Sequence, residues 1–175
     1  AKIAKVSAYM YGQDQINIVE EDALSNISNI KKETYDVLAA NPPFAVEGFL
    51  LNLTEKQKQL YSLIETTELN SNTSNIQCFF IERAKQLMSP GGVAGIIVPS
   101  SILSNSDGTH IGTREILLKY FDIISIVELG SGTFGKTGTN TVILYLKRKS
   151  QKPEPAEHYA NRVEDFFECI NEDDK

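Results

Sequence analysis

Apolar and polar positions along the chain predict strands separated by helices. Five short runs of apolar or β-forming residues favour strands, namely 16–20 (INIVE), 35–40 (YDVLAA), 93–99 (VAGIIVP), 123–129 (IISIVEL) and 141–149 (TVILYLKRK). Apolar residues at helical spacing favour helices over 2–11, over 113–121, and from residue 76 until Pro90-Gly91-Gly92 stop the helix. This alternation indicates an α/β sheet that is mainly parallel.

Two details of the pattern refine this topology. Only the Gly/Thr-rich loop 130–140 joins the last two strands, and it is too short for a helical crossover, so this pair should be antiparallel. The run 93–99 is almost continuously apolar, which is typical of a strand buried on both faces of a parallel sheet. Residues 49–68 have a helical but polar pattern. In the first helix the candidate buried positions are Ile3, Val6, Ala8 and Met10.

Composition adds a boundary near residue 150. The chain has 175 residues and a net charge of −6, and a length of this order fits one domain with a sizeable core. Eight acidic and three basic residues follow Ser150, so the tail carries −5 and the rest only −1. We therefore divide the chain into a domain over 1–150 and an acidic tail over 151–175, read as a linker followed by a helix. The nearly neutral body is not by itself an electrostatic DNA binder.

The rarer residue types exclude several kinds of site. Cys78, Cys169, His110 and His158 are isolated in sequence, so we expect no metal site and no Ser/His triad, and reduced thiols are expected in a cytoplasmic protein. Ser100 has no histidine near it in sequence, which leaves a hydrolase nucleophile poorly supported. No apolar run approaches the roughly 20 residues that a membrane helix needs.

The segment Asn41-Pro42-Pro43-Phe44 ends the second predicted strand. Two prolines remove two backbone donors and fix two φ angles, which makes a stiff, extended turn. The Asn41 side chain and the Pro42 carbonyl could together accept both protons of an NH2 group, and Phe44 could stack on its ring. The rigid acceptors would be preorganised. The alternative is that this segment only terminates a strand.

Three other features also follow predicted strands: Glu21-Asp22, Pro99-Ser100-Ser101, and the loop that contains Phe134. In open α/β sheets, binding sites form beyond the carboxyl ends of the strands. These features should therefore converge with Asn41 at one edge of the sheet. Each also has a plainer interpretation: Asp22 as an ordinary surface acid, Phe134 as a core residue, and the loop residue Lys136 as a solvated lysine rather than a phosphate ligand.

The tetrapeptide resembles motif IV, (D/N/S)PP(Y/F), of amino-methyltransferases that use S-adenosylmethionine. "VEEDAL" looks like their motif III, with Glu21 in place of the common Gly. "FFIERAKQLMSPGGVAGIIVPSSIL" is similar to motifs V and VI, and "VELGSGTFGKTGTNTVILYLKRK" to motif VIII and its hairpin. The resemblance covers about 1–149 and is nearest to N6-adenine DNA methyltransferases of restriction–modification systems, either type I modification subunits or single-chain type IIG enzymes.

The resemblance implies a role for each matching residue of the motif IV turn. Asn41 and the Pro42 carbonyl would accept the N6 protons of an adenine that has flipped out of duplex DNA. Phe44 would stack on that base, and Phe134 could contact it from another side. The methyl group would pass directly to N6.

The resemblance also implies S-adenosylmethionine as cofactor. Asp22 would bind its adenine amino group, and Pro43 would border it. The specificity and restriction subunits or domains of such systems are the implied protein partners.

The family's Gly-rich motif I, which holds the methionine part of the cofactor, has no match before Asp22. The family sheet has the order 3-2-1-4-5-7-6, and strands 3 to 7 are accounted for here. Strand 35–40 therefore lacks its neighbour, and an open edge of this kind favours pairing. We expect it to pair with 16–20 or with another chain, and we expect the chain alone to bind cofactor poorly and to be inactive.

Two other functions remain open. One is methylation of RNA adenine or of a protein glutamine amide, which uses the same clamp chemistry. The other is a subunit that keeps the methyltransferase fold for interaction alone. The sequence does not distinguish a type I from a type IIG organisation.

Overall fold

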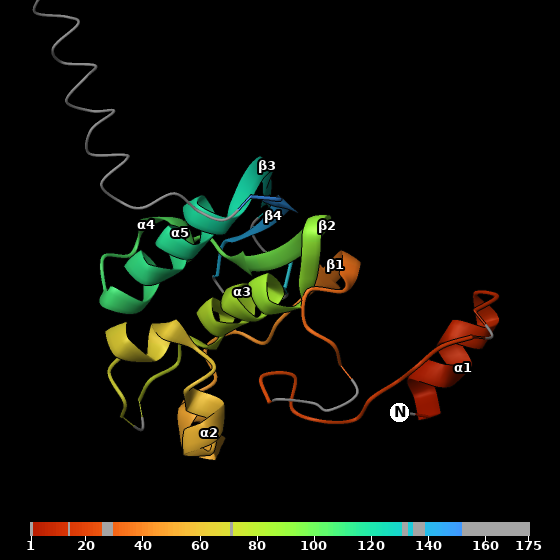
Figure 1. The fold of residues 1–175 in the computed structure, drawn as a ribbon, viewed down its shortest axis with the longest axis horizontal. Helices are drawn as coiled ribbons and strands as arrows, with labels where there is room; N and C mark the ends of the chain where they lie inside the picture. The colour runs from red at the N-terminus through yellow and green to blue at the C-terminus, as the bar shows by residue number, and fades with distance from the viewer. Residues whose placement is uncertain are drawn as a thin grey trace, which may run out of the picture.

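The computed structural model describes residues 2–13, 15–25, 30–70, 72–130, 133–134 and 139–151. Within them lies one four-stranded sheet with the strand order β1-β2-β4-β3 (Figure 1). Its strands are β1 (Tyr35–Ala40), β2 (Met88–Pro99), β3 (Phe121–Leu129) and β4 (Thr141–Arg148). β1 and β2 are parallel, whereas β4 is antiparallel to both β2 and β3. The α/β class and the antiparallel last pair are confirmed.

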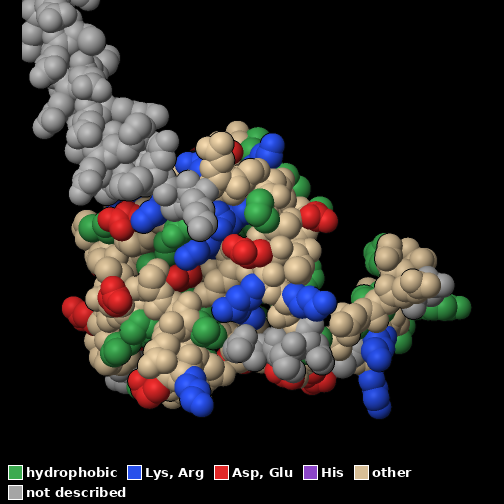
Figure 2. Space-filling view, viewed as in Figure 1, with side chains coloured by type: hydrophobic (Ala, Val, Ile, Leu, Met, Phe, Trp, Pro, Cys, Tyr) green, Lys and Arg blue, Asp and Glu red, His purple; other side chains and the backbone are tan. Residues whose placement is uncertain are grey.

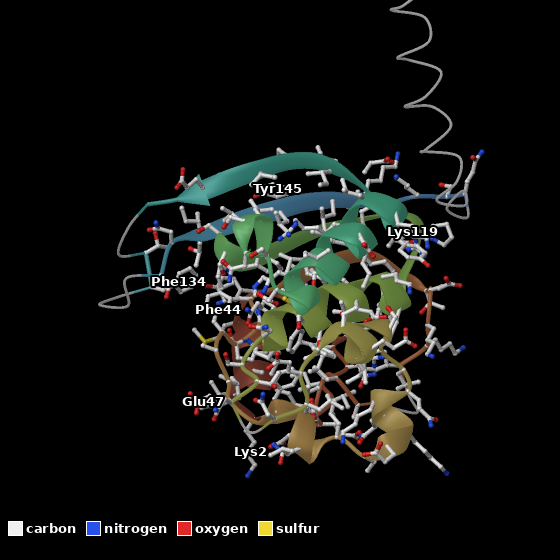
Figure 3. All side chains as sticks on the ribbon, turned by 90° about the vertical axis from the view of Figure 1, so that its left-hand side faces the viewer. Lys2, Phe44, Glu47, Lys119, Phe134 and Tyr145 are labelled. Carbon is white, nitrogen blue, oxygen red and sulfur yellow. The ribbon has the colours of Figure 1, made fainter. Side chains whose placement is uncertain are left out.

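Two helices, α3 (Ile76–Leu87) and α5 (Gly108–Tyr120), cover one face of this sheet (Figure 3). Their buried residues meet those of β2 and β4 in one core that includes Phe79, Ile81, Ala84, Ile96, Val98, Leu117, Leu144 and Leu146. Asp107 caps α5 by accepting a hydrogen bond from the backbone N–H of His110. The core therefore rests on a single helical layer.

The other face of the sheet is open, which corrects the expectation that strand 93–99 is buried on both faces. Along β2, Ala94, Ile96 and Val98 are buried, but Val93, on the opposite face of the strand, is 42% exposed. The strand has apolar residues on both sides, yet the described chain supplies a layer for only one. The burial pattern therefore alternates as in a one-sided sheet.

The predicted strand 16–20 does not form, so the expected five strands become four. Residues 16–20 have no regular structure, and β1 keeps an open edge. A strand needs a hydrogen-bonded neighbour, and β-propensity without one does not determine structure. Pairing of β1 with 16–20 is thus ruled out, while its pairing with another chain stays a prediction.

The first helix, α1 (Lys2–Met10), forms as expected, but none of its residues is buried. It stands apart from the body of the chain in Figure 1. The expectation that Ile3, Val6, Ala8 and Met10 are core residues is wrong for this chain, because no described element packs against α1.

Two further predictions differ in their boundaries. The segment 49–68 is broken into the 3-10 helices η1 (Phe49–Asn52) and η2 (Ser62–Thr66) and the short α2 (Glu55–Lys58), where Thr54 and Gln57 form a capping box. The segment Pro90-Gly91-Gly92 lies inside β2, because α3 already ends at Leu87. The short helix α4 (Ser101–Ser104) follows β2 after Ser100. The proposed tail over 151–175 lies outside the described residues except for Gln151.

Candidate functional site

The motif IV turn begins directly where β1 ends at Ala40. Asn41 and Pro43 are exposed, Pro42 is buried and Phe44 is half-buried. Neither proline has a backbone N–H, so the turn has no donor at these two positions that would compete for the neighbouring acceptors. The amide of Asn41 is therefore held at the surface by a buried anchor one residue further on.

Phe44 contacts Phe134 from the loop between β3 and β4. Their ring centroids are 6.0 Å apart and the planes meet at 79°, which is an edge-to-face pair (Figure 3). The two residues are 90 positions apart in sequence, and the fold brings them to one edge of the sheet. Lys136, from the same loop, lies outside the described residues.

The residue after Phe44 has an unusual backbone. Ala45 has a φ of 52°, in the left-handed region that costs a residue with a Cβ roughly 1–2 kcal/mol. Strain of this kind persists only where the surroundings determine the conformation, and it is commonest near functional sites. It fixes the direction in which the chain leaves the motif IV turn.

Asp22 lies in an exposed turn rather than at the end of a strand. Its Oδ1 accepts a hydrogen bond from the backbone N–H of Leu24 at 2.9 Å, and its carbonyl accepts one from the N–H of Ser25 at 2.9 Å. Leu24 is 2% exposed and anchors the turn in the core. One carboxylate oxygen of Asp22 is thus used locally, and the carboxylate remains at the surface.

The turn around Asp22 is attached to the rest of the chain by Tyr61 and Arg83. The Tyr61 hydroxyl donates to the Leu24 carbonyl at 2.6 Å, and Arg83 donates to the carbonyls of Ala23 and Ser25. Sequence reasoning missed both residues. The available signal was a charged residue, Arg83, on the apolar side of the helix that also carries Ile76 and Phe79.

The segment Pro99-Ser100-Ser101 closes the end of β2. Pro99 pairs with Thr141 in register, and the Ser100 N–H donates to the Asn140 carbonyl at 2.9 Å. This contact joins the segment to the loop that carries Phe134. Ser100 therefore shapes the edge of the site through its backbone.

His110 and Cys78, the described imidazole and thiol, both have structural surroundings. His110 Nδ1 lies 2.6 Å from Asp107 Oδ2, at the start of α5. Burial raises the pKa of Cys78 to about 11, although a hydrogen bond with Thr113 opposes the shift. Cys169 and His158 lie outside the described residues. No cluster of three or more metal-ligating side chains occurs in the described part of the chain.

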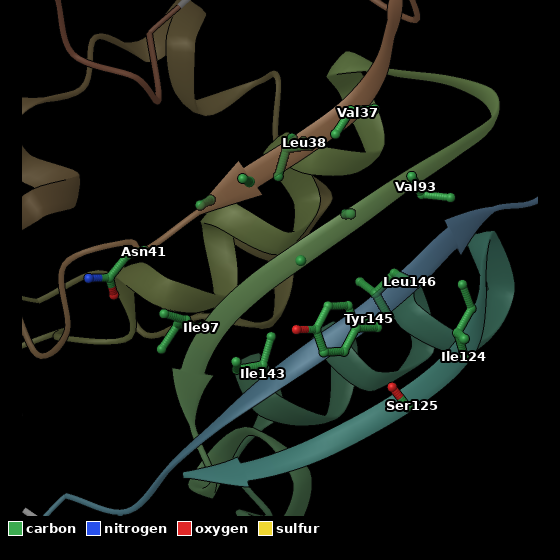
Figure 4. Close-up of a pocket in the computed structure, with 14 residues that line it drawn as sticks. Val37, Leu38, Asn41, Val93, Ile97, Ile124, Ser125, Ile143, Tyr145 and Leu146 are labelled. Atoms are coloured by element: carbon green, nitrogen blue, oxygen red, sulfur yellow. The ribbon is translucent and has the colours of Figure 1, made fainter. Parts of the chain in front are cut away.

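The surface offers a hollow and a mixed charge pattern. A hollow of about 890 Å³ runs along the open face of the sheet and is lined almost wholly by apolar side chains, with Asn41 at one end (Figure 4). On the face shown in Figure 2, Lys and Arg side chains form small groups separated by acidic ones. In the described ranges, no helix is both long and apolar enough to cross a bilayer.

Comparison with known proteins identifies the family. The model of the N-6 DNA methylase family matches residues 1–166. The chain belongs to the N-6 DNA methylase family. It is 33% identical, over 110 residues, to the type II methyltransferase M.BanIII of Aneurinibacillus aneurinilyticus, an alignment that covers 63% of this chain and 17% of that protein. The predicted relation to methyltransferases of restriction–modification systems is confirmed at this level.

Solved structures confirm the fold. The chain superposes with a TM-score of 0.64 on a Listeria monocytogenes protein described as a class I S-adenosylmethionine-dependent methyltransferase, with 19% identity over 87% of this chain and 43% of that one. It superposes with a TM-score of 0.61 on the M protein of the type I restriction enzyme EcoKI, with 19% identity over 87% of this chain and 30% of that one. The N-6 DNA methylase chain described here thus spans less than half the length of each of these proteins.

Proposed function

We propose that the polypeptide carrying this chain is a site-specific DNA methyltransferase that transfers a methyl group from S-adenosylmethionine to N6 of an adenine flipped out of the duplex. The observation that carries the proposal is the juxtaposition of the motif IV turn with Phe134. Family membership supports the DNA substrate, and the geometry supports a clamp for a planar base with an exocyclic amine.

The acceptors of the clamp would act on the amine. The Asn41 side-chain oxygen and the Pro42 carbonyl oxygen are neutral acceptors, and the proline rings limit their movement. Accepting both N6 protons would turn the nitrogen lone pair out of conjugation with the ring. The amine would then attack without an ionised base, since proton loss can follow methyl transfer.

The aromatic pair would hold the base. Phe44 is half-buried and in contact with Phe134, so its ring would be held while part of the side chain remains accessible. Stacking of a base on such a ring is worth about 1–3 kcal/mol. Phe134, in edge contact with Phe44, would limit the position of the base from a second direction.

The described residues fit one part of S-adenosylmethionine. The exposed Asp22 carboxylate suits an adenine amino group, and Pro43 offers an exposed apolar border beside the clamp. No Gly-rich motif I for the methionine part precedes Asp22 in the sequence. When bound, the cofactor supplies an electrophilic methyl group on a sulfonium, and this chain orients the acceptor amine toward it.

The fit to only part of the cofactor has a consequence for the chain alone. We propose that these 175 residues bind S-adenosylmethionine weakly and are inactive by themselves. In the complete protein, duplex DNA would be the substrate, and specificity and restriction subunits or domains would be partners. Titration calorimetry of the chain alone should show no binding at micromolar concentrations.

The test of the function uses the full-length polypeptide and labelled S-adenosylmethionine. Transfer to duplex DNA containing adenine is expected, and Asn41→Ala should lower it by about 100-fold or more, by analogy with loss of one preorganised hydrogen-bonding group. Asn105→Ala, at another exposed asparagine, is the matched control. Transfer to RNA or to protein glutamine in place of DNA would overturn the proposal, and full-length protein without any transfer would favour an interaction subunit.

A further inference from the structure

The turn at residues 22–25 is held by hydrogen bonds to three successive carbonyl oxygens. Arg83 Nε donates to the Ala23 carbonyl at 3.0 Å, the Tyr61 hydroxyl to the Leu24 carbonyl at 2.6 Å, and Arg83 Nη2 to the Ser25 carbonyl at 2.9 Å. Tyr61 and Arg83 come from different segments of the chain, 22 positions apart. Together they determine the path of the backbone directly after Asp22.

Contacts outside the turn also hold both donor side chains, Tyr61 and Arg83, in place. Tyr61 and Arg83 are each 3% exposed, and Tyr61 stacks edge-on against Phe79 with centroids 5.5 Å apart. Arg83 also donates from Nη1 to the Gln86 side chain at 2.9 Å, and Gln86 in turn donates to the Leu60 carbonyl at 2.8 Å. The guanidinium is therefore oriented by a second contact on its own helix.

The turn depends on these side chains because regular structure does not hold it. Residues 16–20, which precede it, form no strand, so no sheet ladder fixes Asp22. Within the turn, only the Asp22 contacts with Leu24 and Ser25 define its shape. Besides the burial of Leu24 in the core, the hydrogen bonds from Tyr61 and Arg83 place that shape relative to the rest of the domain.

The protonation of Tyr61 favours the same arrangement. Burial raises the pKa of Tyr61 well above its ordinary value; the Arg83 charge opposes this shift, while the negative charges of Glu82 and Asp22 add to it. The hydroxyl therefore remains a donor at every pH near neutrality.

We propose that Arg83 and Tyr61 are positioning residues that fix the Asp22 carboxylate for recognition of the adenine amino group of S-adenosylmethionine. This inference rests on the proposed function. It assigns a binding role to α3, which otherwise serves only as a packing helix under the sheet. Neither residue touches the cofactor; each acts through the backbone of the turn.

A neighbouring residue offers a matched control. Glu82 is 1% exposed and accepts three hydrogen bonds, from the Ser62 N–H and hydroxyl at 2.8 Å each and from the Leu63 N–H at 3.1 Å. It lies next to Arg83 on the same helix and anchors η2 rather than the Asp22 turn. Glu82→Gln and Arg83→Met thus both disturb a buried polar anchor, but only Arg83→Met releases the turn.

The experiment measures cofactor binding and steady-state kinetics in the full-length polypeptide at a temperature where all variants are folded. Arg83→Met should raise both Kd and KM for S-adenosylmethionine about tenfold, and Tyr61→Phe about threefold, with kcat at saturating cofactor and DNA affinity nearly unchanged. Glu82→Gln should leave Kd and KM for the cofactor unchanged even if it lowers Tm as much as Arg83→Met does.

Amide hydrogen exchange supplies a readout that needs no cofactor. Exchange at the amides of Leu24 and Ser25 should accelerate in Arg83→Met and not in Glu82→Gln. Equal cofactor affinity in wild type and Arg83→Met, or equal effects of both variants on affinity and exchange, would overturn this inference alone. A wild-type protein that binds no S-adenosylmethionine would overturn the proposed function and, with it, the role assigned to Arg83.

Discussion

The two faces of the sheet have similar side chains but different surroundings. On β4, Leu144 and Leu146 are fully buried on the face covered by helices, whereas Tyr145 between them is 42% exposed in the hollow. Val37 and Val93, on β1 and β2, line the same hollow. Both faces are apolar, so the sequence is suited to a sheet with a layer on each side, and the described residues provide one layer.

The covered face stabilises the chain, whereas the open face is a surface on which other segments can pack. The covered face supplies the core, at about 1.5–3 kcal/mol for each large apolar side chain that is fully buried. The open face and the free edge of β1 lie beside Asn41, so any segment that packs there would also border the candidate site. The stability of the chain therefore depends on the covered face, whereas the candidate site borders the open one.

The sharpest test of the comparison uses two adjacent residues of β4. Leu144→Ala should lower the free energy of unfolding by about 2–5 kcal/mol, because it leaves a cavity in the covered face. Ile143→Ala, which removes a side chain from the open face, should cost less than about 1 kcal/mol. Urea denaturation of the chain measures both. Comparable losses would mean that the open face is covered in solution.

Two glycines test how closely the two sides of the sheet are packed: one lies in the helical layer and the other on the open face. A Cβ at Gly108 would lie 2.5 Å from the Thr66 carbonyl oxygen, where α5 meets η2, so Gly108→Ala should destabilise by about 1–3 kcal/mol. A Cβ at Gly95, on the open face, would meet only the Tyr145 ring at 3.6 Å. Gly95→Ala should therefore change stability by no more than about 0.5 kcal/mol. The comparison fails if thermal unfolding ranks the two substitutions in the opposite order.

The pattern of the sequence predicted the covered half of the molecule well. The apolar stripe of α3 and the runs in β2 and β4 each determined an element, because those segments bury a face against one another. The run in β3 forms a strand by pairing with β4, although Phe121 is its only buried residue. The run 16–20 has comparable β-propensity but no neighbour, and it forms no strand. Periodicity reports that a segment can pack; it does not report whether the partner is present.

The candidate site was predictable to a similar extent. The sequence predicted that strand ends meet at one edge of the sheet, with Phe44 and Phe134 among the residues there. The distance between the two rings agrees with this prediction. Their roles in binding a base stay predictions. The Tyr61–Arg83 attachment was predictable only in part: Arg83 on the apolar side of α3 indicated a buried partner, but the acceptors are backbone carbonyls, which leave no mark on the sequence.

The decrease in the free energy of unfolding at alkaline pH tests the burial of the covered face. The Cys78 thiol is fully buried beneath the sheet, and its pKa is raised to about 11 from an ordinary value of 9.0. The unfolded chain loses this proton first, so the stabilisation is complete below pH 9 and is lost as the pH rises toward 11. The loss attributable to Cys78 should be about 2 kcal/mol by pH 11, and Cys78→Ala should reduce the slope. Tyr61 contributes in the same direction, so some slope should remain. A variant whose slope equals that of wild type between pH 9 and 11 would show that Cys78 ionises as freely in the folded state.

The smallest effect on folding, and the most direct test of the open edge, is expected at Val37. This residue of β1 is 72% exposed, at the edge that has no partner strand in the described chain. We expect the chain to self-associate through this edge as its concentration rises, since an unpaired apolar strand favours strand addition. Val37→Lys should change the free energy of unfolding by no more than about 0.5 kcal/mol, because little burial is lost, while a charge at the edge should suppress association. Sedimentation velocity over a concentration series measures this, with Leu118→Lys, at a 64% exposed site on α5, as the matched control. Association that is equal in wild type and Val37→Lys, or that Leu118→Lys removes equally well, would place the contact elsewhere and leave the open edge of β1 without a role in assembly.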